Sequence, residues 1–140
     1  YQSGGEPMRV SPVWSLGGQY LPFANTSISL VTYRNFQVSP SLNNQSYWAT
    51  GVELGITQTI AQKFQIGVSG GYENDTYVAN ERNVDANRVD NFFFIQPEIS
   101  YNFLKYLTAT IFYQHRFNDS TQQVDTWYDN QVGFEISAAF

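Results

Sequence analysis

The chain has 140 residues, with 3 Trp, 10 Tyr and 11 Phe, no Cys and a single His. The lack of Cys excludes disulfide scaffolds, thiolate metal sites and Cys nucleophiles, and a single His excludes a multi-histidine metal centre. Its 7 basic and 12 acidic residues give a net charge of −5. This charge excludes the strongly basic surface that binding to nucleic acid requires, so no nucleic-acid partner is expected.

Low charge is combined in this chain with low hydropathy. Charged residues make up 14% of the sequence, and the mean hydropathy is −0.34. A helical membrane protein has low charge and high hydropathy, whereas a soluble domain has about 25% charged residues. A transmembrane β-barrel has neither signature, because apolar and polar residues alternate along its strands and average out. The longest uncharged run, 10–33, contains Pro, Gly, Gln and Asn and is too polar for a spanning helix.

Period-two alternation of apolar and polar residues predicts β-strands along most of the chain. The alternation is weaker over 27–38, because Val31 and Tyr33 fall on the otherwise polar face. Pro97 lies inside a predicted strand and lacks an N–H, so this strand is expected to be perturbed there or to begin later. The predicted strands, in chain order, are 10–22, 27–38, 47–60, 64–77, 90–103, 106–117 and 127–140.

The connections between the predicted strands alternate in length. Outer-membrane barrels have short periplasmic turns and long outer loops between strands of about 10 residues. With the C-terminus on the periplasmic side, every short connection of this chain lies in the periplasm and every long one lies outside. The short connections are 22–26, 61–63 and 104–105, and the long polar ones are 39–46, 74–89 and 118–126.

Together these patterns predict an all-β protein, an antiparallel up-and-down transmembrane β-barrel. Bacterial single-chain barrels have even strand numbers. The seven visible strands therefore predict at least one further strand upstream. Residues 1–140 are expected to form a single β-barrel domain or the C-terminal portion of a larger one.

One face of the predicted strands is polar and is expected to line a hydrated lumen. It carries four acidic residues and one basic residue, and rings of carboxylates favour cations. Alternatively, the carboxylates pair with basic residues of further strands or line a plugged lumen. The predicted pore-lining residues are Glu53, Thr57, Gln65, Ser69, Glu73, Gln96, Glu98, Ser100, Thr108, Thr110, Gln114, Arg116, Gln131, Glu135 and Ser137.

Aromatic residues gather near the predicted strand ends. Outer-membrane barrels carry aromatic girdles at both lipid interfaces, because an amphipathic ring prefers the headgroup level. Outer-membrane lipid is therefore an expected partner, and no cofactor is expected. The predicted girdle residues are Trp48, Phe64, Tyr72, Phe103, Tyr106, Tyr113, Trp127 and Tyr128.

The chain ends on an aromatic residue preceded by apolar residues at alternate positions, namely Phe134, Ile136, Ala138 and Phe140. This ending resembles the C-terminal signal of bacterial outer-membrane barrels, which implies the barrel-assembly machinery as a partner during biogenesis. Four further segments are distinctive: Arg88-Val89-Asp90, Pro97-Glu98-Ile99-Ser100-Tyr101, Tyr113-Gln114-His115-Arg116 and Tyr128-Asp129-Asn130. With them the chain resembles the β-barrel porin type 2 family, whose members often accompany exopolysaccharide export systems. The resemblance implies a place in the outer membrane of a Gram-negative bacterium.

Catalytic chemistry has little support in the sequence. His115 falls on the apolar face and is interpreted as an interfacial side chain. A catalytic role would require a nucleophile and an orienting carboxylate within reach, and Ser120 and Asp119 are the candidates nearby. No motif places them, so no catalytic residue and no metal site are predicted, and the protein is not expected to be an enzyme.

The sequence leaves three functional hypotheses. The first is a porin or channel that passes small polar solutes or takes part in exopolysaccharide-associated transport. The second is a non-conducting structural or adhesive barrel within a larger envelope assembly, or a homo-oligomer in which several copies share one barrel. The third is a soluble ligand-binding β-barrel, in which the apolar face would point inward.

Overall fold

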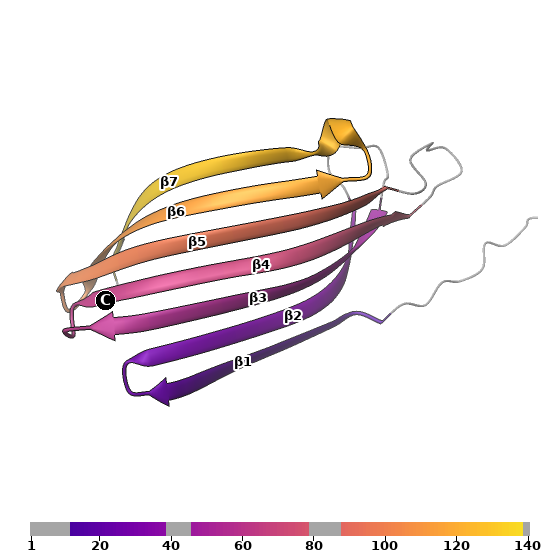
Figure 1. Ribbon diagram of the computed structural model, residues 1–140. Helices are drawn as coiled ribbons and strands as arrows, with labels where there is room; N and C mark the ends of the chain where they lie inside the picture. Colours follow the sequence, from indigo (N-terminus) through magenta and orange to yellow (C-terminus); the bar gives the residue numbers. More distant parts are fainter. Residues whose placement is uncertain (1–11, 39–45, 79–87, 139–140) are drawn as a thin grey trace, which may run out of the picture.

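The computed structural model describes residues 12–38, 46–78 and 88–138. These residues form a single antiparallel sheet of seven strands in the order β1-β2-β3-β4-β5-β6-β7 (Figure 1). One short 3₁₀-helix, η1, precedes the last strand. The elements are β1 Trp14–Phe23, β2 Thr26–Val38, β3 Ser46–Ile60, β4 Phe64–Val78, β5 Val89–Leu104, β6 Leu107–Ser120, η1 Gln123–Asp125 and β7 Trp127–Ala138.

The seven predicted strands are confirmed as elements, and most of their bounds agree within a few residues. β6 extends to Ser120, so the last connection is shorter than the predicted 118–126. The predicted strand 10–22 begins at Trp14 in the structure, with residues 10 and 11 outside the described part. Residues 139 and 140, which include the terminal Phe140 of the predicted assembly signal, also lie outside the described part. An all-β, up-and-down antiparallel sheet is therefore established.

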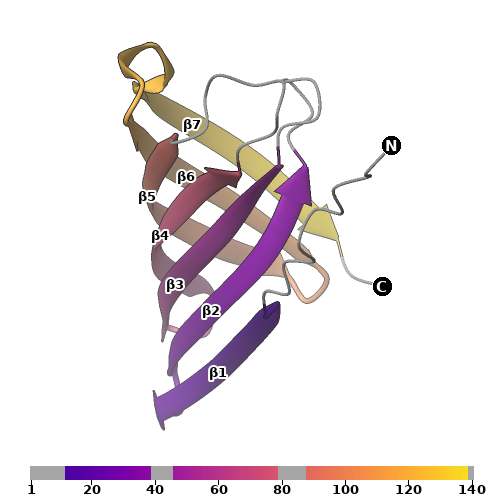
Figure 2. The same cartoon turned by 90° about the vertical axis from the view of Figure 1, so that its right-hand side faces the viewer.

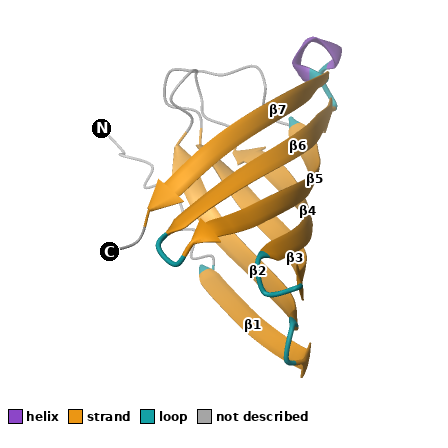
Figure 3. Ribbon diagram, turned by 90° about the vertical axis from the view of Figure 1, so that its left-hand side faces the viewer, coloured by secondary structure: helices purple, strands orange, loops and turns teal. Residues whose placement is uncertain are grey.

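The described sheet is open, so closure into a barrel stays a prediction. Every described pairing joins neighbours in the chain, and no pairing joins β1 to β7 within the described residues. The sheet is strongly twisted and curved, and β1 and β7 form its two margins (Figures 2 and 3). This curvature gives the sheet an inner and an outer face.

The connections fall into two sets at opposite ends of the strands. At one end, tight turns at 24–25, 61–63 and 105–106 join β1 to β2, β3 to β4 and β5 to β6. At the other end, η1 lies between β6 and β7, β2 ends at Val38 and β4 at Val78, and β3 and β5 begin (Figure 1). Residues 39–45 and 79–87 lie outside the described part. We call these the turn end and the loop end. The predicted alternation of short and long connections is thus confirmed.

Pro97 lies within β5 and interrupts only one of its two ladders. The register with β4 runs on through Val68 opposite Pro97. On the β6 side, pairing stops after Ile95 and resumes at Glu98 without a change of register. The strand is therefore perturbed locally and does not begin later, because a proline lacks only the hydrogen bond that its own N–H would donate.

The outer face of the sheet is apolar. Leu54, Ile95 and Ile111 are among its side chains, with exposed fractions of 46%, 50% and 59%. Among the described residues other than glycine, only Ala49 has a fully buried apolar side chain, with an exposed fraction of 0%. A water-soluble domain buries its apolar side chains in a core, so this sheet has the opposite arrangement.

Candidate functional site: the inner face of the sheet

The inner face is defined by the cross-strand register. One row of residues crosses the whole sheet from β1 to β7. Its neighbours are direct ladder partners, except that Gln96 and Gln114 are joined by a side-chain hydrogen bond. The row consists of Gln19, Ser29, Gly55, Ser69, Gln96, Gln114 and Gln131. All fifteen residues predicted to line a pore belong to this face, because their positions share its parity in every ladder. The register thus brings them together on one surface, while their role as a pore lining stays a prediction.

Burial distinguishes this face from the outer one. The buried residues of the described chain all belong to it: Ala49, Gly51, Gly67, Asp90, Ser100 and Asn118. Side chains converge on the concave side of a curved sheet and diverge on its convex side. The polar face is therefore the inner face of the curved sheet.

Side-chain hydrogen bonds cross the strands along this surface. Gln114 Nε2 of β6 donates to Gln96 Oε1 of β5 at 3.0 Å, and Gln96 Nε2 in turn donates to Glu98 Oε2 of the same strand at 3.3 Å. The Ser100 and Thr110 hydroxyls lie 2.8 Å apart. The Gln96–Gln114 bond links β5 to β6 at the gap that Pro97 leaves in the backbone ladder, and the Ser100–Thr110 contact links them beyond it.

Aromatic rings on the inner face lie over glycines of the adjacent strand. A Cβ added to Gly51 would lie 2.5 Å from Cζ of Tyr33. A Cβ at Gly71 would overlap the ring of Phe94, and one at Gly133 would overlap the ring of Phe112. Because each glycine has no Cβ, it leaves the space in which the ring from the adjacent strand lies against the sheet. By crossing Gly51, the Tyr33 hydroxyl reaches Glu73 Oε2 and donates a hydrogen bond of 2.5 Å.

The charges of the inner face are unevenly paired. Arg116 forms an ion pair with Asp129. None of Glu53, Glu73, Glu98 and Glu135 forms an ion pair with another described residue. Carboxylates therefore dominate the unpaired charge of this surface.

A dense polar cluster lies at the loop end of the inner face. Arg88 forms ion pairs with Asp90, at 2.5 Å, and with Asp125 of η1, at 2.7 Å. Its guanidinium carbon lies 4.6 Å from the ring centroid of Tyr77, and the Ser120 hydroxyl donates to Asp90 Oδ1 at 2.5 Å. The hydrogen bond to Asp90 raises the pKa of the Arg88 guanidinium above its usual value, so this charge is permanent. We call Tyr77, Arg88, Asp90, Ser120 and Asp125 the Arg88 cluster.

An open hollow of about 310 Å³ lies beside this cluster. It combines carboxylates, an amide and aromatic rings at the loop end of the inner face. Its lining residues are Glu73, Asp75, Tyr77, Arg88, Asp90, Phe92, Asn118 and Trp127.

The predicted girdle residues are divided between the two faces. On the outer face, Tyr72 pairs with Phe93, Phe93 with Phe117 and Phe117 with Tyr128, which makes one continuous row across β4 to β7. The rings of Tyr72 and Phe93 lie 4.8 Å apart. Trp48 lies nearer the loop end, 4.9 Å from Phe36.

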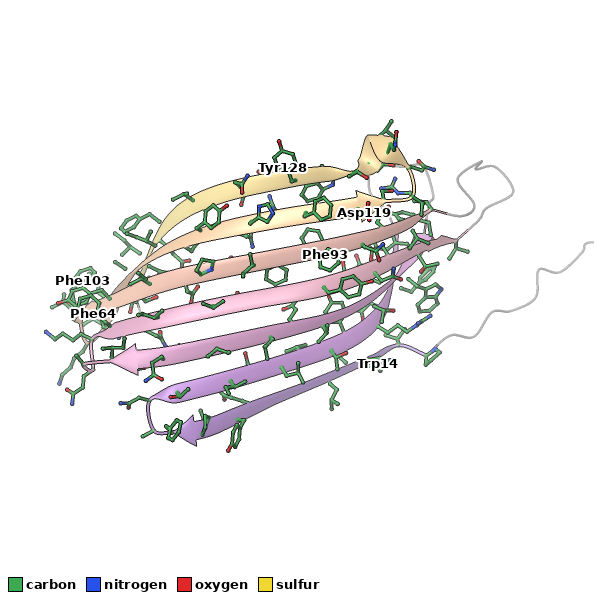
Figure 4. The ribbon with its side chains drawn as sticks, in the orientation of Figure 1. Trp14, Phe64, Phe93, Phe103, Asp119 and Tyr128 are labelled. Carbon is green, nitrogen blue, oxygen red and sulfur yellow. The ribbon has the colours of Figure 1, made fainter. Side chains whose placement is uncertain are left out.

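A second aromatic group lies at the turn end, eight residues along β4 from Tyr72. The rings of Phe64 and Tyr101 lie 4.6 Å apart, and those of Tyr101 and Phe103 lie 6.4 Å apart. Phe64 and Phe103 lie close together at this end, whereas Asp119 lies toward the other (Figure 4). Tyr106 belongs to the adjacent turn.

Trp127 differs from the predicted girdle. Its position in the β6–β7 register puts it on the inner face, where its ring lies 6.0 Å from that of Phe92. The neighbouring Tyr128 points to the outer face, with an exposed fraction of 75%. Adjacent strand residues point to opposite faces, so the two cannot share one girdle. Phe93 and Phe117 take part in the outer row, and period-two parity applied to every aromatic residue would have identified them.

His115 and Asp119 lie on the outer face, whereas the candidate nucleophile Ser120 lies on the inner face. His115 Nδ1 lies 2.8 Å from Asn130 Oδ1 on the outer face, and the Tyr113 hydroxyl donates to the same oxygen at 2.6 Å. Ser120 belongs to the inner face and donates to Asp90. The structure therefore does not bring the three candidate residues together.

Metal-holding clusters and membrane-spanning helices are both absent from residues 12–38, 46–78 and 88–138. No group of three or more His, Cys, Asp or Glu side chains there is arranged to hold a metal ion. No helix in these segments has the length and apolar character needed to cross a membrane. In comparison with known proteins, no family model, no curated protein and no solved structure matches the chain.

Proposed function

We propose that this sheet is part of the wall of a bacterial outer-membrane β-barrel that acts as a porin or channel. The outer face lies against lipid, and the inner face lines a hydrated path for small polar solutes or for exopolysaccharide-associated transport. The observation that carries the proposal is the inverted arrangement of the sheet. Its apolar side chains are exposed on the outside, and its buried residues belong to a polar inside.

The spacing of the outer aromatic groups supports a membrane setting. Phe64 and Tyr72 are eight residues apart on β4, which is about 26 Å along a strand. At a strand tilt of about 40°, this gives about 20 Å along the membrane normal, close to the apolar band of about 25 Å in outer-membrane barrels. The outer residues between them include Ile66 and Val68. On β4 and β5 the outer positions next to Tyr72 and Phe93 on the loop side are polar, namely Asn74 and its partner Asn91.

The inverted arrangement disfavours a soluble ligand-binding barrel. Such a barrel would turn its apolar face inward and present a surface with roughly a quarter to a third of charged residues. In this chain the exposed outer face contains large apolar side chains from every strand. In water, that apolar surface would be prone to association with other molecules, whereas in a membrane the lipid would solvate it.

The first experiment extracts the protein from native membranes and compares its migration in SDS with and without boiling. A closed hydrogen-bonded barrel resists SDS until it is heated, so we expect a compact species that shifts on boiling. Absence from the membrane fraction, together with no heat-dependent shift, would contradict the outer-membrane proposal and favour the soluble barrel.

The second experiment separates a channel from a non-conducting barrel. The protein is reconstituted in a planar bilayer, and single-channel conductance is measured for the native chain, for Ser69→Trp and for Val68→Trp. Ser69 belongs to the inner face and Val68 to the outer one. We expect Ser69→Trp to reduce conductance and Val68→Trp to leave it unchanged. A heat-modifiable protein that never conducts would instead be a structural or adhesive barrel.

A further inference from the structure

An apolar groove of about 500 Å³ lies on the outer face of β1, β2 and β3. Gly18 forms its floor on β1, because no atom lies within 4 Å of a Cβ built at this position, and Leu16 and Tyr20 lie on either side of it along the strand. Leu30 is the ladder partner of Gly18, and Leu54 is that of Leu30, so the groove crosses three strands. The apolar side chains of its lining are Leu16, Tyr20, Ile28, Leu30 and Leu54.

Arg34 lies next to the loop-side end of this groove. It follows the groove residue Thr32 by two positions on β2, so both point to the outer face. Its ladder partners are Trp14 on β1 and Thr50 on β3, and Trp14 lies toward the loop end (Figure 4). Thr50 is opposite Asn74, so Arg34 belongs to the polar row that comes directly after the outer aromatic row. In the proposed membrane setting, this row lies at the level of the lipid headgroups.

Arg34 is the only basic residue on the outer face of the seven described strands. These strands contain two basic residues, Arg34 and Arg116, and Arg116 belongs to the inner face. Arg34 forms no ion pair with another described residue. The carboxylate that these strands carry on the outer face, Asp119, lies on β6, with three strands in between. The charge of Arg34 is therefore not compensated by the described part of the protein.

The guanidinium of Arg34 is held in place and still has free donors. Its Cζ lies 5.2 Å from the ring centroid of Trp48, a cation–π contact that orients the planar group. Nη1 donates to Thr50 Oγ1 at 3.5 Å, which is long for a hydrogen bond, and Nε has no hydrogen-bond partner among the described residues. A guanidinium has five N–H donors, so donors remain for an anion.

The positions of the guanidinium and the groove match the two parts of a lipid. Arginine binds phosphate through paired N–H···O bonds, and the phosphates of lipids lie at the headgroup level. From Arg34 the groove extends into the apolar band, which is the direction in which acyl chains extend from a phosphate. It covers the four-residue step from Leu16 to Tyr20, about 13 Å along a strand. One lipid molecule can therefore contact both features at once.

We infer that Arg34 and the groove form a binding site for one membrane lipid with an anionic phosphate headgroup. The phosphate accepts hydrogen bonds from Arg34 beside Trp14 and Trp48, and one acyl chain lies in the groove over Gly18. This inference rests on the proposed membrane barrel and adds to it a specific lipid partner at one position of the wall.

Native mass spectrometry of the intact protein, extracted from its membrane and delipidated in detergent, tests the inference. Three probes are added separately at equal concentration: phosphatidic acid, the diacylglycerol with the same acyl chains, and inorganic phosphate. We expect one phosphatidic acid to bind per chain, about tenfold more tightly than the diacylglycerol, because only the former makes charge-assisted hydrogen bonds with Arg34. Inorganic phosphate should bind more weakly than phosphatidic acid, because it makes no contact with the groove.

Two substitutions alter the two halves of the site separately. Arg34→Gln should lower the affinity for phosphatidic acid by about tenfold and leave that for the diacylglycerol unchanged. Gly18→Leu should lower the affinity for both lipids, because the new side chain fills the groove from a position whose Cβ meets no other atom. Lys105→Gln is the control, because it removes one positive charge from the turn between β5 and β6, and it should leave binding unchanged.

Several results would overturn the inference. An unchanged affinity for phosphatidic acid in either Arg34→Gln or Gly18→Leu would show that the lipid does not use this site. Equal binding of the diacylglycerol would refute the role of the phosphate, and equal binding of inorganic phosphate would indicate a site for free anions. A dimer that persists without lipid and is lost in Gly18→Leu would show that a second copy of the chain occupies the groove.

The heat-dependent shift in SDS electrophoresis is measured on the same samples. If the protein is absent from the membrane fraction and does not shift on boiling, the membrane barrel itself is refuted and the inference falls with it. If the native chain and the variants keep the shift, their fold is intact, and the binding result concerns the lipid site alone.

Discussion

Gly51 is the residue on which the Tyr33–Glu73 hydrogen bond depends. The ring of Tyr33 crosses the strand at this glycine, and a Cβ there would lie 2.5 Å from the ring. The same relation holds for Gly71 with Phe94 and for Gly133 with Phe112. Cross-strand pairs of this kind couple neighbouring strands through side chains in addition to the backbone ladder.

Gly51→Ala should therefore destabilise the folded protein. The added methyl group displaces the Tyr33 ring and weakens its bond to Glu73, which should lower the free energy of unfolding by about 1–3 kcal/mol. Urea unfolding in detergent, followed by tryptophan fluorescence, measures the change. Gly18→Ala is the matched control, because no atom lies within 4 Å of a Cβ at that position. Equal effects of the two substitutions would contradict the steric argument.

Arg88 is the residue that joins β5 to η1 at the loop end. Its side chain is 10% exposed and that of Asp90 is 6% exposed, so removal of Arg88 leaves a buried carboxylate without its cation. Arg88→Ala should lower the free energy of unfolding by about 3 kcal/mol. Arg88→Lys should lower it less, because a lysine keeps the charge and loses the two-pronged contact.

The Arg116–Asp129 pair provides an internal comparison for this prediction. Its side chains are 32% and 38% exposed, and an ion pair accessible to water contributes about 1 kcal/mol or less. The same unfolding measurement on Arg116→Ala should therefore show a clearly smaller loss. A larger loss for Arg116→Ala than for Arg88→Ala would show that burial does not control the strength of these pairs.

At the scale of elements, the turn between β3 and β4 contains two residues with left-handed backbone. Ala61 has φ of 51° and Gln62 has φ of 62°, a region in which a side chain clashes with the backbone and glycine does not. The tight turn holds the register of the two strands, which begins with Ile60 opposite Phe64.

Gln62→Gly should stabilise the β3–β4 hairpin for this reason. Relief of the backbone strain should raise the free energy of unfolding by about 1 kcal/mol, partly offset by the greater freedom of glycine in the unfolded chain. Ala24→Gly in the β1–β2 turn is the control, because Ala24 has a negative φ. That substitution should lower the free energy of unfolding by about 0.5 kcal/mol. A loss of stability in Gln62→Gly would refute the assignment of strain to this turn.

Strand β5 offers a test of the two faces at adjacent positions. Ile95 points to the outer face, with an exposed fraction of 50%, and Gln96 points to the inner face beside Gln114. Ile95→Arg should lower the free energy of unfolding by about 2–4 kcal/mol in lipid, because a charge on the lipid-facing side is poorly solvated there.

Gln96→Arg should be tolerated in the same experiment, because water and nearby carboxylates solvate a charge on the inner face. Folding into lipid vesicles, followed by the heat-dependent shift in SDS electrophoresis, compares the two variants. If Ile95→Arg folds as well as Gln96→Arg, the outer face is not in contact with lipid.

At the scale of the whole molecule, unpaired carboxylates determine the electrostatic character of the inner face. Glu53, Glu73, Glu98 and Glu135 form no ion pair with described residues, and the charge of Arg116 is compensated by Asp129. Charged side chains that line a pore favour ions of the opposite sign. We therefore predict that the open channel prefers cations to anions.

The reversal potential in a bilayer with a KCl gradient measures this preference. The double variant Glu53→Gln/Glu98→Gln should reduce the ratio of cation to anion permeability, because two unpaired charges are removed from the wall. Asp119→Asn is the control, because Asp119 belongs to the outer face, opposite Asn91 in the β5–β6 ladder. An anion preference in the native channel would refute the prediction without affecting the barrel proposal.

The sequence by itself determined the strands, their two faces and the order of short and long connections. These features depend on period-two alternation and on turn length, which are local properties of the chain. Even the irregular placement of Val31 and Tyr33 on the inner face followed from parity. The fifteen polar residues predicted for one face share that face because each strand keeps its alternation through the ladder.

Only the tertiary structure decided which residues meet across strands. The ring of Tyr33 over Gly51, the Arg88 cluster and the place of Trp127 against Phe92 depend on cross-strand register and on side-chain reach. These contacts join residues that are many positions apart, and alternation within one strand carries no information on them. The same reason applies to the perturbed ladder at Pro97, because the affected neighbour is fixed by strand order and register. The open margins of β1 and β7 likewise emerge only when the strands are assembled, because a strand does not encode what pairs with its second side.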